Sequence, residues 1–170
     1  YLQVIHFKTA KLFEAATRLG AVICNASKAQ EQALAKYGMH LGTAFQLIDD
    51  VLDYSGNQSD IGKNVGDDLR EGKRTALVAI TLEHCSESDR GRIDLLLGNR
   101  TMPTADLDWL KQRMIDSGAV AAVEQLIADH QQLANEALSQ LHLPAESHWL
   151  LIKKLPTIPL LKAGSVIWMG

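Results

Sequence analysis

Residues 118–141 read GAVAAVEQLIADHQQLANEALSQL, and their apolar side chains recur at helical spacing. The positions separated by three, four or seven residues are Val120, Val123, Ile127, Ala134, Leu138 and Leu141. A helix of about 3.6 residues per turn brings such positions to one side, whereas a strand would divide them between its two faces. We therefore predict one long amphipathic helix over residues 118–141.

Helical periodicity recurs on both sides of this stretch, and no segment alternates as a half-buried strand would. Thr104 is the expected N-cap of the preceding helix, which Gly118 would end. Short connections indicate antiparallel packing, so the predicted fold class is an all-α helical bundle. The predicted helices cover residues 1–25, 29–54, 73–84, 88–97, 105–117, 118–141 and 145–154.

The composition is ordinary for one globular domain, with 170 residues, 46% hydrophobic and 22% charged. A formal net charge of -3 gives no general attraction to nucleic acid or to an anionic membrane surface. No uncharged apolar run reaches roughly 18 residues, so we expect no transmembrane helix. Cys24 and Cys85 lack CxxC spacing, which predicts neither a zinc site nor a disulfide and fits a reducing cytoplasm. The first residues read as the middle of a helix, so we expect the chain to begin inside a larger protein.

The strongest chemical signal is FQLIDDVLD at residues 45–53. On a helical wheel, Gln46, Asp49, Asp50 and Asp53 lie within about a third of the circumference. Like charges one turn apart destabilise a helix by roughly 0.2–0.5 kcal/mol per pair, and no Lys or Arg lies one turn away. Carboxylates on a rigid helix suit Mg²⁺, which binds them together with substrate phosphates. An acidic, solvated helix face accounts equally well for such a short motif taken alone.

Basic residues flank this motif along the chain. The glycine-rich residues 55–68 form the one long predicted loop, and Lys63 and Lys73 lie in it and just after it. Ammonium groups beside glycines are suited to hold phosphate as point charges. Lys8 and Thr9 lie on an apolar helix, where the hydroxyl can donate to a diphosphate oxygen. Taken alone, Lys63 and Lys73 are better explained as surface charges, and Lys8 is explained at least as well in that way.

Together these segments resemble trans-polyprenyl diphosphate synthases, most closely the bacterial long-chain enzymes of the octaprenyl type. The matching segments read KT at 8–9, GTAFQLIDDVLDY at 42–54, GKNVGDDL at 62–69 and GK at 72–73. The resemblance implies an isoprenoid synthase fold, with residues 1–155 as the C-terminal part of its single domain. Residues 156–170 would be an atypical tail.

The resemblance also implies Mg²⁺ as the cofactor and assigns roles to the residues of the matching segments. Asp49 would be a direct metal ligand, with Asp50 and Asp53 completing the acidic site. Asp49, Lys8 and Lys63 would be the catalytic residues. The diphosphate of the allylic substrate would be bound by Lys8, Thr9, Gln46, Lys63 and Lys73.

The implied activity is the condensation of isopentenyl diphosphate with an allylic diphosphate, giving long-chain polyprenyl diphosphates for quinone side chains such as that of ubiquinone. A cytoplasmic homodimer is expected. A shorter-chain synthase making farnesyl or geranylgeranyl diphosphate, or a noncatalytic subunit of the same fold, are the alternatives. This chain lacks the family's upstream aspartate-rich motif, has Arg74 where the family usually has Pro, and ends atypically from residue 150. We therefore expect the chain alone to be inactive.

Overall fold

The computed structural model describes residues 1–55 and 66–141, which form helices and no strand. The all-α prediction is confirmed. Lys63, the predicted helix at 145–154 and the tail at 156–170 lie outside the described residues. The helices are α1 (Leu2–Ile5), the π-helical turn η1 (His6–Ala10), α2 (Lys11–Ile23), α3 (Lys28–Ser55), α5 (Asp67–Arg70), α6 (Ala76–His84), α7 (Glu87–Leu96), α8 (Thr104–Asp116) and α9 (Ala119–Ser139).

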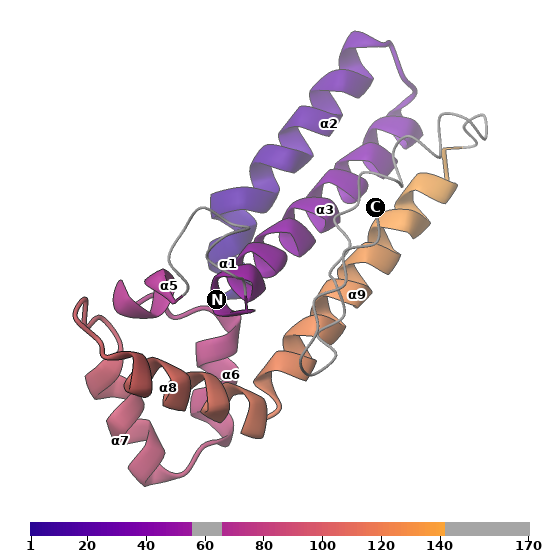
Figure 1. Ribbon diagram of the computed structural model, residues 1–170. Coiled ribbons are helices and arrows are strands. Elements are labelled where there is room, and N and C mark those ends of the chain that lie inside the picture. Colours follow the sequence, from indigo (N-terminus) through magenta and orange to yellow (C-terminus); the bar gives the residue numbers. More distant parts are fainter. Residues whose placement is uncertain (56–65, 142–170) are drawn as a thin grey trace.

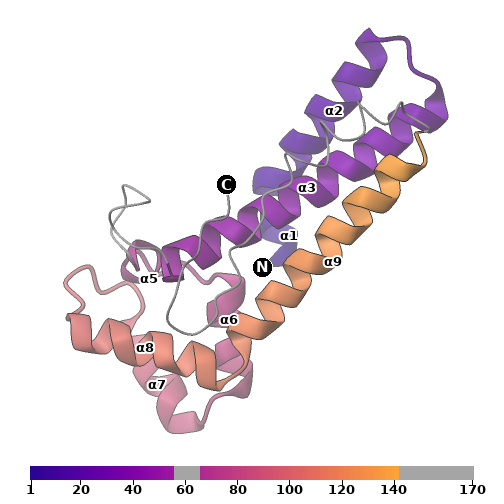
Figure 2. The ribbon, with the colours of Figure 1, turned by 45° about the vertical axis from the view of Figure 1, so that its right-hand side comes forward.

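Three long helices form one arm of the molecule (Figures 1 and 2). The central helix, α3, packs against α2 on one side and against α9 on the other, and it runs antiparallel to both. The shorter helices α5 to α8 gather at the end where α3 finishes. The segment that contains the acidic motif therefore lies where the long arm meets the short helices.

The arm packs closely because glycines on α3 face the preceding helices. A Cβ atom at Gly42 would lie 2.8 Å from the Cα of Ala10, and one at Gly38 would lie 2.6 Å from the carbonyl oxygen of Phe13. Both separations are too short for real Cβ contacts. Because glycine has no side chain, η1 and α2 can approach α3 closely at these two positions.

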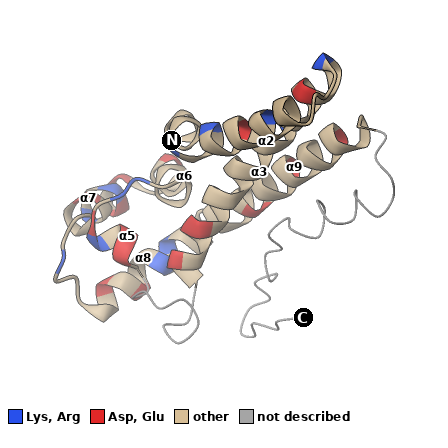
Figure 3. Cartoon of the chain, turned by 90° about the horizontal axis from the view of Figure 1, so that it is seen from above, with Lys and Arg blue, Asp and Glu red and all other residues tan. Residues whose placement is uncertain are grey.

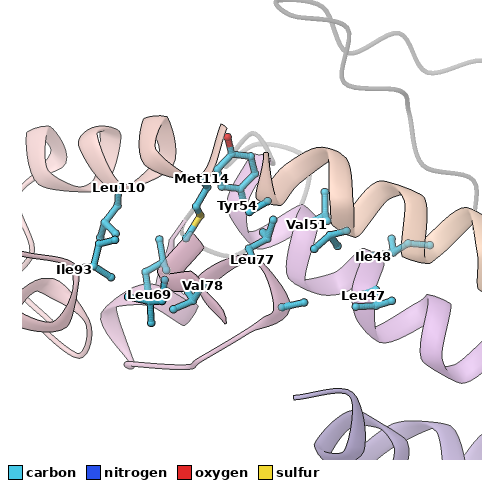
Figure 4. Close-up of a cluster of buried hydrophobic side chains, with 14 of the residues drawn as sticks. Leu47, Ile48, Val51, Tyr54, Leu69, Leu77, Val78, Ile93, Leu110 and Met114 are labelled. Carbon is cyan, nitrogen blue, oxygen red and sulfur yellow. The ribbon is translucent and has the colours of Figure 1, made fainter. Parts of the chain in front are cut away.

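The main hydrophobic core lies at the C-terminal end of α3, where side chains of α3 pack against α6, α8 and α9. Figure 4 shows Val51 and Tyr54 of α3 near Leu77 and Met114, with Leu47 further along α3 and Leu110 further along α8. A second cluster joins the first half of α3 to the last turns of α9. Together they account for the apolar stripe of residues 118–141, since Val123, Ile127 and Leu138 are fully buried.

Several predicted boundaries differ from the structure. The predicted helix at 1–25 is interrupted by the π-helical turn η1. The short helix α5 begins at Asp67, inside the loop predicted for residues 55–68, and ends at Arg70. The predicted helix at 73–84 begins only at Ala76, after an extended Thr75. The prediction of Thr104 as an N-cap is wrong by one residue, because Pro103 holds that position with extended backbone.

An apolar face remains exposed on α2 and on the turns before it. Phe7, Leu12, Leu19, Val22 and Ile23 are each between 58% and 72% exposed. Most lie on one side of the helix at spacings of three, four and seven residues. A continuous apolar face of this kind is typical of an interface.

Candidate active site

A pocket of about 420 Å³ lies beside the acidic motif. The start of the chain forms one wall, where Val4 and Ile5 are apolar lining residues. The segment between α5 and α6 forms another wall, and Thr75 is buried there. Charged and amide side chains from both walls and from α3 line it together: Lys8, Gln46, Asp49, Asp50, Asp68 and Lys73.

The backbone places these side chains in one region although they are far apart in sequence. Gly72 has a φ of +76°, which favours glycine, and it turns the chain between α5 and Lys73. A Cβ atom there would also lie 3.2 Å from the Cα of Gly98. Figure 3 shows basic and acidic segments side by side around α5, α7 and α8, so charges of both signs are interspersed at this end of the molecule.

Asp50 is the buried carboxylate of the motif, with only 5% of its surface exposed. The Tyr1 hydroxyl donates a short hydrogen bond to its Oδ2, and the Gln46 amide donates to its Oδ1 at 3.2 Å. The pKa of Asp50 is raised to about 6, chiefly by burial; the hydrogen bonds from Tyr1 and Gln46 oppose this rise, and the charges of Asp68 and Asp49 add to it. Asp50 is therefore easier to protonate than an ordinary aspartate.

Asp49 is the exposed carboxylate of the motif, and its Oδ2 accepts a long contact of 3.4 Å from the same Gln46 amide nitrogen. The Oε1 atom of Gln46 accepts a hydrogen bond of 2.7 Å from the Thr9 hydroxyl. The amide group is thereby oriented with its NH₂ towards both carboxylates. Thr9 acts on the pocket through Gln46, and it is not itself among the lining residues.

Asp53 is not among the residues that line the pocket, and its carboxylate contacts α5. Its Oδ2 accepts from the backbone N–H of Asp68 at 3.2 Å, and its carbonyl oxygen accepts from Gly66 at 3.0 Å. Burial raises the pKa of Asp53, and Asp68 adds to the effect. The helical wheel grouped Asp53 with the other two aspartates, whereas packing against α5 gives it a different environment.

Lys73 is held at the pocket by two carboxylates, since it forms ion pairs with Asp68 and, at 2.9 Å, with Glu71. The hydrogen bond with Asp68 raises the pKa of Lys73, with Glu71 contributing, so the ammonium stays charged. Arg74 also lines the pocket and pairs with Asp94 at 2.9 Å. The Lys73–Glu71 and Arg74–Asp94 pairs are about half exposed on both sides, so each contributes little to stability.

The donor set fits Mg²⁺ only in combination with further ligands. Among the described residues, no three acidic, histidine or cysteine side chains converge closely enough to hold a metal ion by themselves. The pocket nevertheless presents the oxygens of Asp49, Asp50 and Asp68 to one space. Such hard ligands suit Mg²⁺, which commonly keeps water and phosphate oxygens in its coordination shell. The described part of the chain also contains no helix long and apolar enough to cross a membrane.

The structure defines an all-α protein in which an acidic helix and lysines line one pocket, and sequence comparison identifies its family. Residues 1–114 match the polyprenyl synthetase family. Octaprenyl diphosphate synthase from Escherichia coli is 49% identical over 140 residues, which cover 74% of this chain and 43% of that protein. The chain belongs to the polyprenyl synthetase family.

Solved structures give the same relationship. A polyprenyl synthase from Caulobacter crescentus, complexed with calcium and isoprenyl diphosphate, is 38% identical with a TM-score of 0.81. A geranylgeranyl pyrophosphate synthase from Corynebacterium glutamicum, complexed with isoprenyl diphosphate and magnesium, is 31% identical with a TM-score of 0.82. The matches cover 91% and 90% of this chain but 47% and 45% of those chains. The chain thus spans less than half the length of these relatives.

Of the residues singled out from the sequence, Lys8, Gln46, Asp49, Asp50 and Lys73 line one pocket. Thr9 and Asp53 lie one hydrogen bond away from lining residues. The roles of all these residues remain predictions, as does that of Lys63. Sequence reasoning assigned no role to Tyr1, Asp68 or Arg74. Asp68 and Arg74 lay in or beside the matching segments, whereas nothing in the sequence pointed to Tyr1.

Proposed function

We propose that the protein containing this chain condenses isopentenyl diphosphate with an allylic diphosphate to form long-chain trans-polyprenyl diphosphates, precursors of quinone side chains. The observation that carries the proposal is a pocket in which Lys8 and Lys73 meet Asp49 and Asp50 of the acidic motif. The similarity to octaprenyl diphosphate synthases supports long products. A cytoplasmic homodimer is part of the proposal and rests on the resemblance.

The charges of the pocket support a requirement for Mg²⁺. Three carboxylates and three cationic side chains line it, so it has little net charge of its own. A diphosphate brings several negative charges, and it enters a space already occupied by aspartates. Divalent cations bound between the carboxylates and the diphosphate would remove this repulsion. The ligands in this chain would be Asp49 directly, with Asp50 and Asp53 completing the site directly or through water.

The side chains of this chain would bind and orient the diphosphate. Lys8 and Lys73 line the pocket from different segments and would donate hydrogen bonds to the diphosphate oxygens, and Lys63 is proposed as a third cationic contact. Thr9 would keep the Gln46 amide fixed near the head of the substrate. When bound, Mg²⁺ would supply electrostatic stabilisation of the departing diphosphate.

The test is turnover by the complete protein with radiolabelled isopentenyl diphosphate and an allylic primer. Products of about octaprenyl length that require Mg²⁺ are expected, and chelation should abolish them. Products that stop at farnesyl or geranylgeranyl length would favour the shorter-chain alternative. Absence of any condensation would favour the noncatalytic subunit, although the retained aspartates and lysines argue against it.

We also infer that residues 1–170 alone do not elongate prenyl diphosphates. One acidic helix supplies only part of the coordination that a departing diphosphate needs, and the rest would fall to water in an open cleft of high dielectric. Incorporation of labelled isopentenyl diphosphate by the isolated chain would contradict this inference. Weak affinity for Mg²⁺ and pyrophosphate is compatible with it.

A further inference from the structure

Tyr1 makes a long-range contact with the acidic motif. It precedes α1, yet its hydroxyl donates a hydrogen bond to Oδ2 of Asp50, 49 residues later in the chain. The other oxygen of Asp50 accepts from the Gln46 amide at 3.2 Å. Both oxygens of this buried carboxylate therefore have donors supplied by the protein itself.

The neighbouring aspartates are held differently. Asp49 is exposed and receives only the long 3.4 Å contact from Gln46 among the hydrogen bonds of the described residues. Asp53 accepts from a backbone N–H of α5. Asp50 is thus the one aspartate of the motif that is fixed from two sides by side chains.

A tyrosine hydroxyl suits this task because it donates a hydrogen bond without adding charge. A lysine or arginine in its place would neutralise Asp50 and weaken the attraction of the pocket for cations. Burial raises the pKa of Tyr1, so its hydroxyl keeps the proton that it donates. The ring also packs against the hydrophobic core, which limits the movement of the hydroxyl.

The contact also connects two parts of the pocket. Tyr1 lies just before α1, and Lys8 and Thr9 follow it in η1. Asp50 and Gln46 lie on α3. Two hydrogen bonds join the start of the chain to α3: Tyr1 donates to Asp50, and Thr9 donates to Gln46. They fix the Gln46 amide and the Asp50 carboxylate relative to Lys8.

The geometry points to Tyr1 as a positioning residue of the diphosphate site: with Gln46 it holds Asp50 in a single orientation and leaves Asp49 as the carboxylate free to meet a metal-bound diphosphate. The inference rests on the proposed function and deepens it. It assigns the affinity of the site for Mg²⁺ and pyrophosphate in part to a residue outside the acidic motif.

The experiment is calorimetric titration of the complete protein with inorganic pyrophosphate in the presence of Mg²⁺, without turnover. Tyr1→Phe keeps the ring and removes only the hydroxyl. We expect about tenfold weaker pyrophosphate binding, the loss of roughly one hydrogen bond to a charged group. The matched control is Tyr54→Phe, which removes a buried hydroxyl from the same helix as Asp50 but outside the pocket, and should bind as the wild type does.

A second measurement tests the contact itself. In metal-free thermal unfolding, Tyr1→Phe and Asp50→Ala should be non-additive, because each removes the same hydrogen bond. Wild-type affinity in Tyr1→Phe, or strict additivity of the two substitutions, would overturn the positioning role. If the wild-type protein binds no pyrophosphate with Mg²⁺, the proposed function fails and this inference fails with it.

Discussion

The hydroxyl of Thr9 donates a hydrogen bond of 2.7 Å to Oε1 of Gln46, joining the π-helical turn η1 to α3. The Gln46 amide thereby accepts a hydrogen bond from η1 and donates towards two carboxylates of α3. Because π-helical turns are rare and concentrate at functional sites, the position of Thr9 within one is informative. The interaction makes the orientation of Gln46 depend on the π-helical turn.

Thr9→Val should lower turnover by the complete protein on the order of tenfold, because the Gln46 amide loses the hydrogen bond that orients it. Thr43→Val is the control, since that hydroxyl donates to the carbonyl of Met39 within its own helix. Steady-state kinetics at saturating Mg²⁺ would measure both variants. Equal turnover in the two would remove Thr9 from the site.

Asp49→Ala should lower turnover by orders of magnitude while the protein remains folded, because a proposed metal ligand is lost together with like-charge repulsion. Kinetics and urea unfolding of the same preparation would separate the two effects. A fully active Asp49→Ala enzyme would contradict the proposed metal site. A large loss of stability would show that Asp49 has a structural role that its exposure does not suggest.

Asp50→Asn should stabilise the fold in the absence of metal. The pKa of Asp50 is raised in the folded state to about 6 from 3.8, so its contribution favours folding at low pH and is lost as pH rises through about 6. Without metal at pH 8, the ionised and buried carboxylate is destabilising, and Asn should stabilise the fold by on the order of 2 kcal/mol. The difference between variant and wild type should shrink at pH 5. A difference that does not change with pH would exclude this explanation.

Gly42→Ala should destabilise the fold by about 1–3 kcal/mol, because the added methyl group would meet the Cα of Ala10 at 2.8 Å. Displacing η1 should also weaken binding of pyrophosphate with Mg²⁺, since η1 carries Lys8 and Thr9. Gly91→Ala is the control, because nothing lies within 4 Å of a Cβ atom there, and it should stabilise α7 by about 0.5–1 kcal/mol. Chemical denaturation would test both. Similar effects at the two glycines would show that the close approach is unimportant.

His40 and His130 should make stability fall in mild acid. Their Nδ1 atoms lie 3.0 Å apart between α3 and α9. Burial lowers the pKa of both rings, and each ring also has charged neighbours: Lys36 and Glu136 act on His40, and Asp129 acts on His130. With folded pKa values below the unfolded value, their contribution is present above about pH 6.5 and is lost as pH falls.

His40→Gln should therefore reduce the loss of thermal stability between pH 7.5 and 5.5, relative to the wild type. His84→Gln, at an exposed histidine of α6, should not change it. The variants are compared with the wild type because protonation of Asp50 raises the stability of the fold as the pH falls, whereas protonation of the histidines lowers it. If His40→Gln leaves the pH dependence unchanged, the pair does not couple α3 to α9.

The sequence by itself determined the helical fold, and it singled out five of the side chains that line the pocket. The spacing of Val123, Ile127 and Leu138 is a local property of a helix, and all three are buried as it requires. The grouping of Gln46, Asp49 and Asp50 on one side of α3 also follows from helical geometry alone. Their joint presence in one pocket agrees with it.

Only the tertiary structure decided the environment of each aspartate. Helical periodicity brings side chains to one side, but it does not determine what covers that side, because the covering groups come from distant parts of the chain. Tyr1 covers Asp50, the backbone of α5 binds Asp53, and Asp49 remains exposed. Three identical residues within five positions thereby acquire different burial and different hydrogen-bond partners, and through these the tertiary contacts shift the pKa values of Asp50 and Asp53.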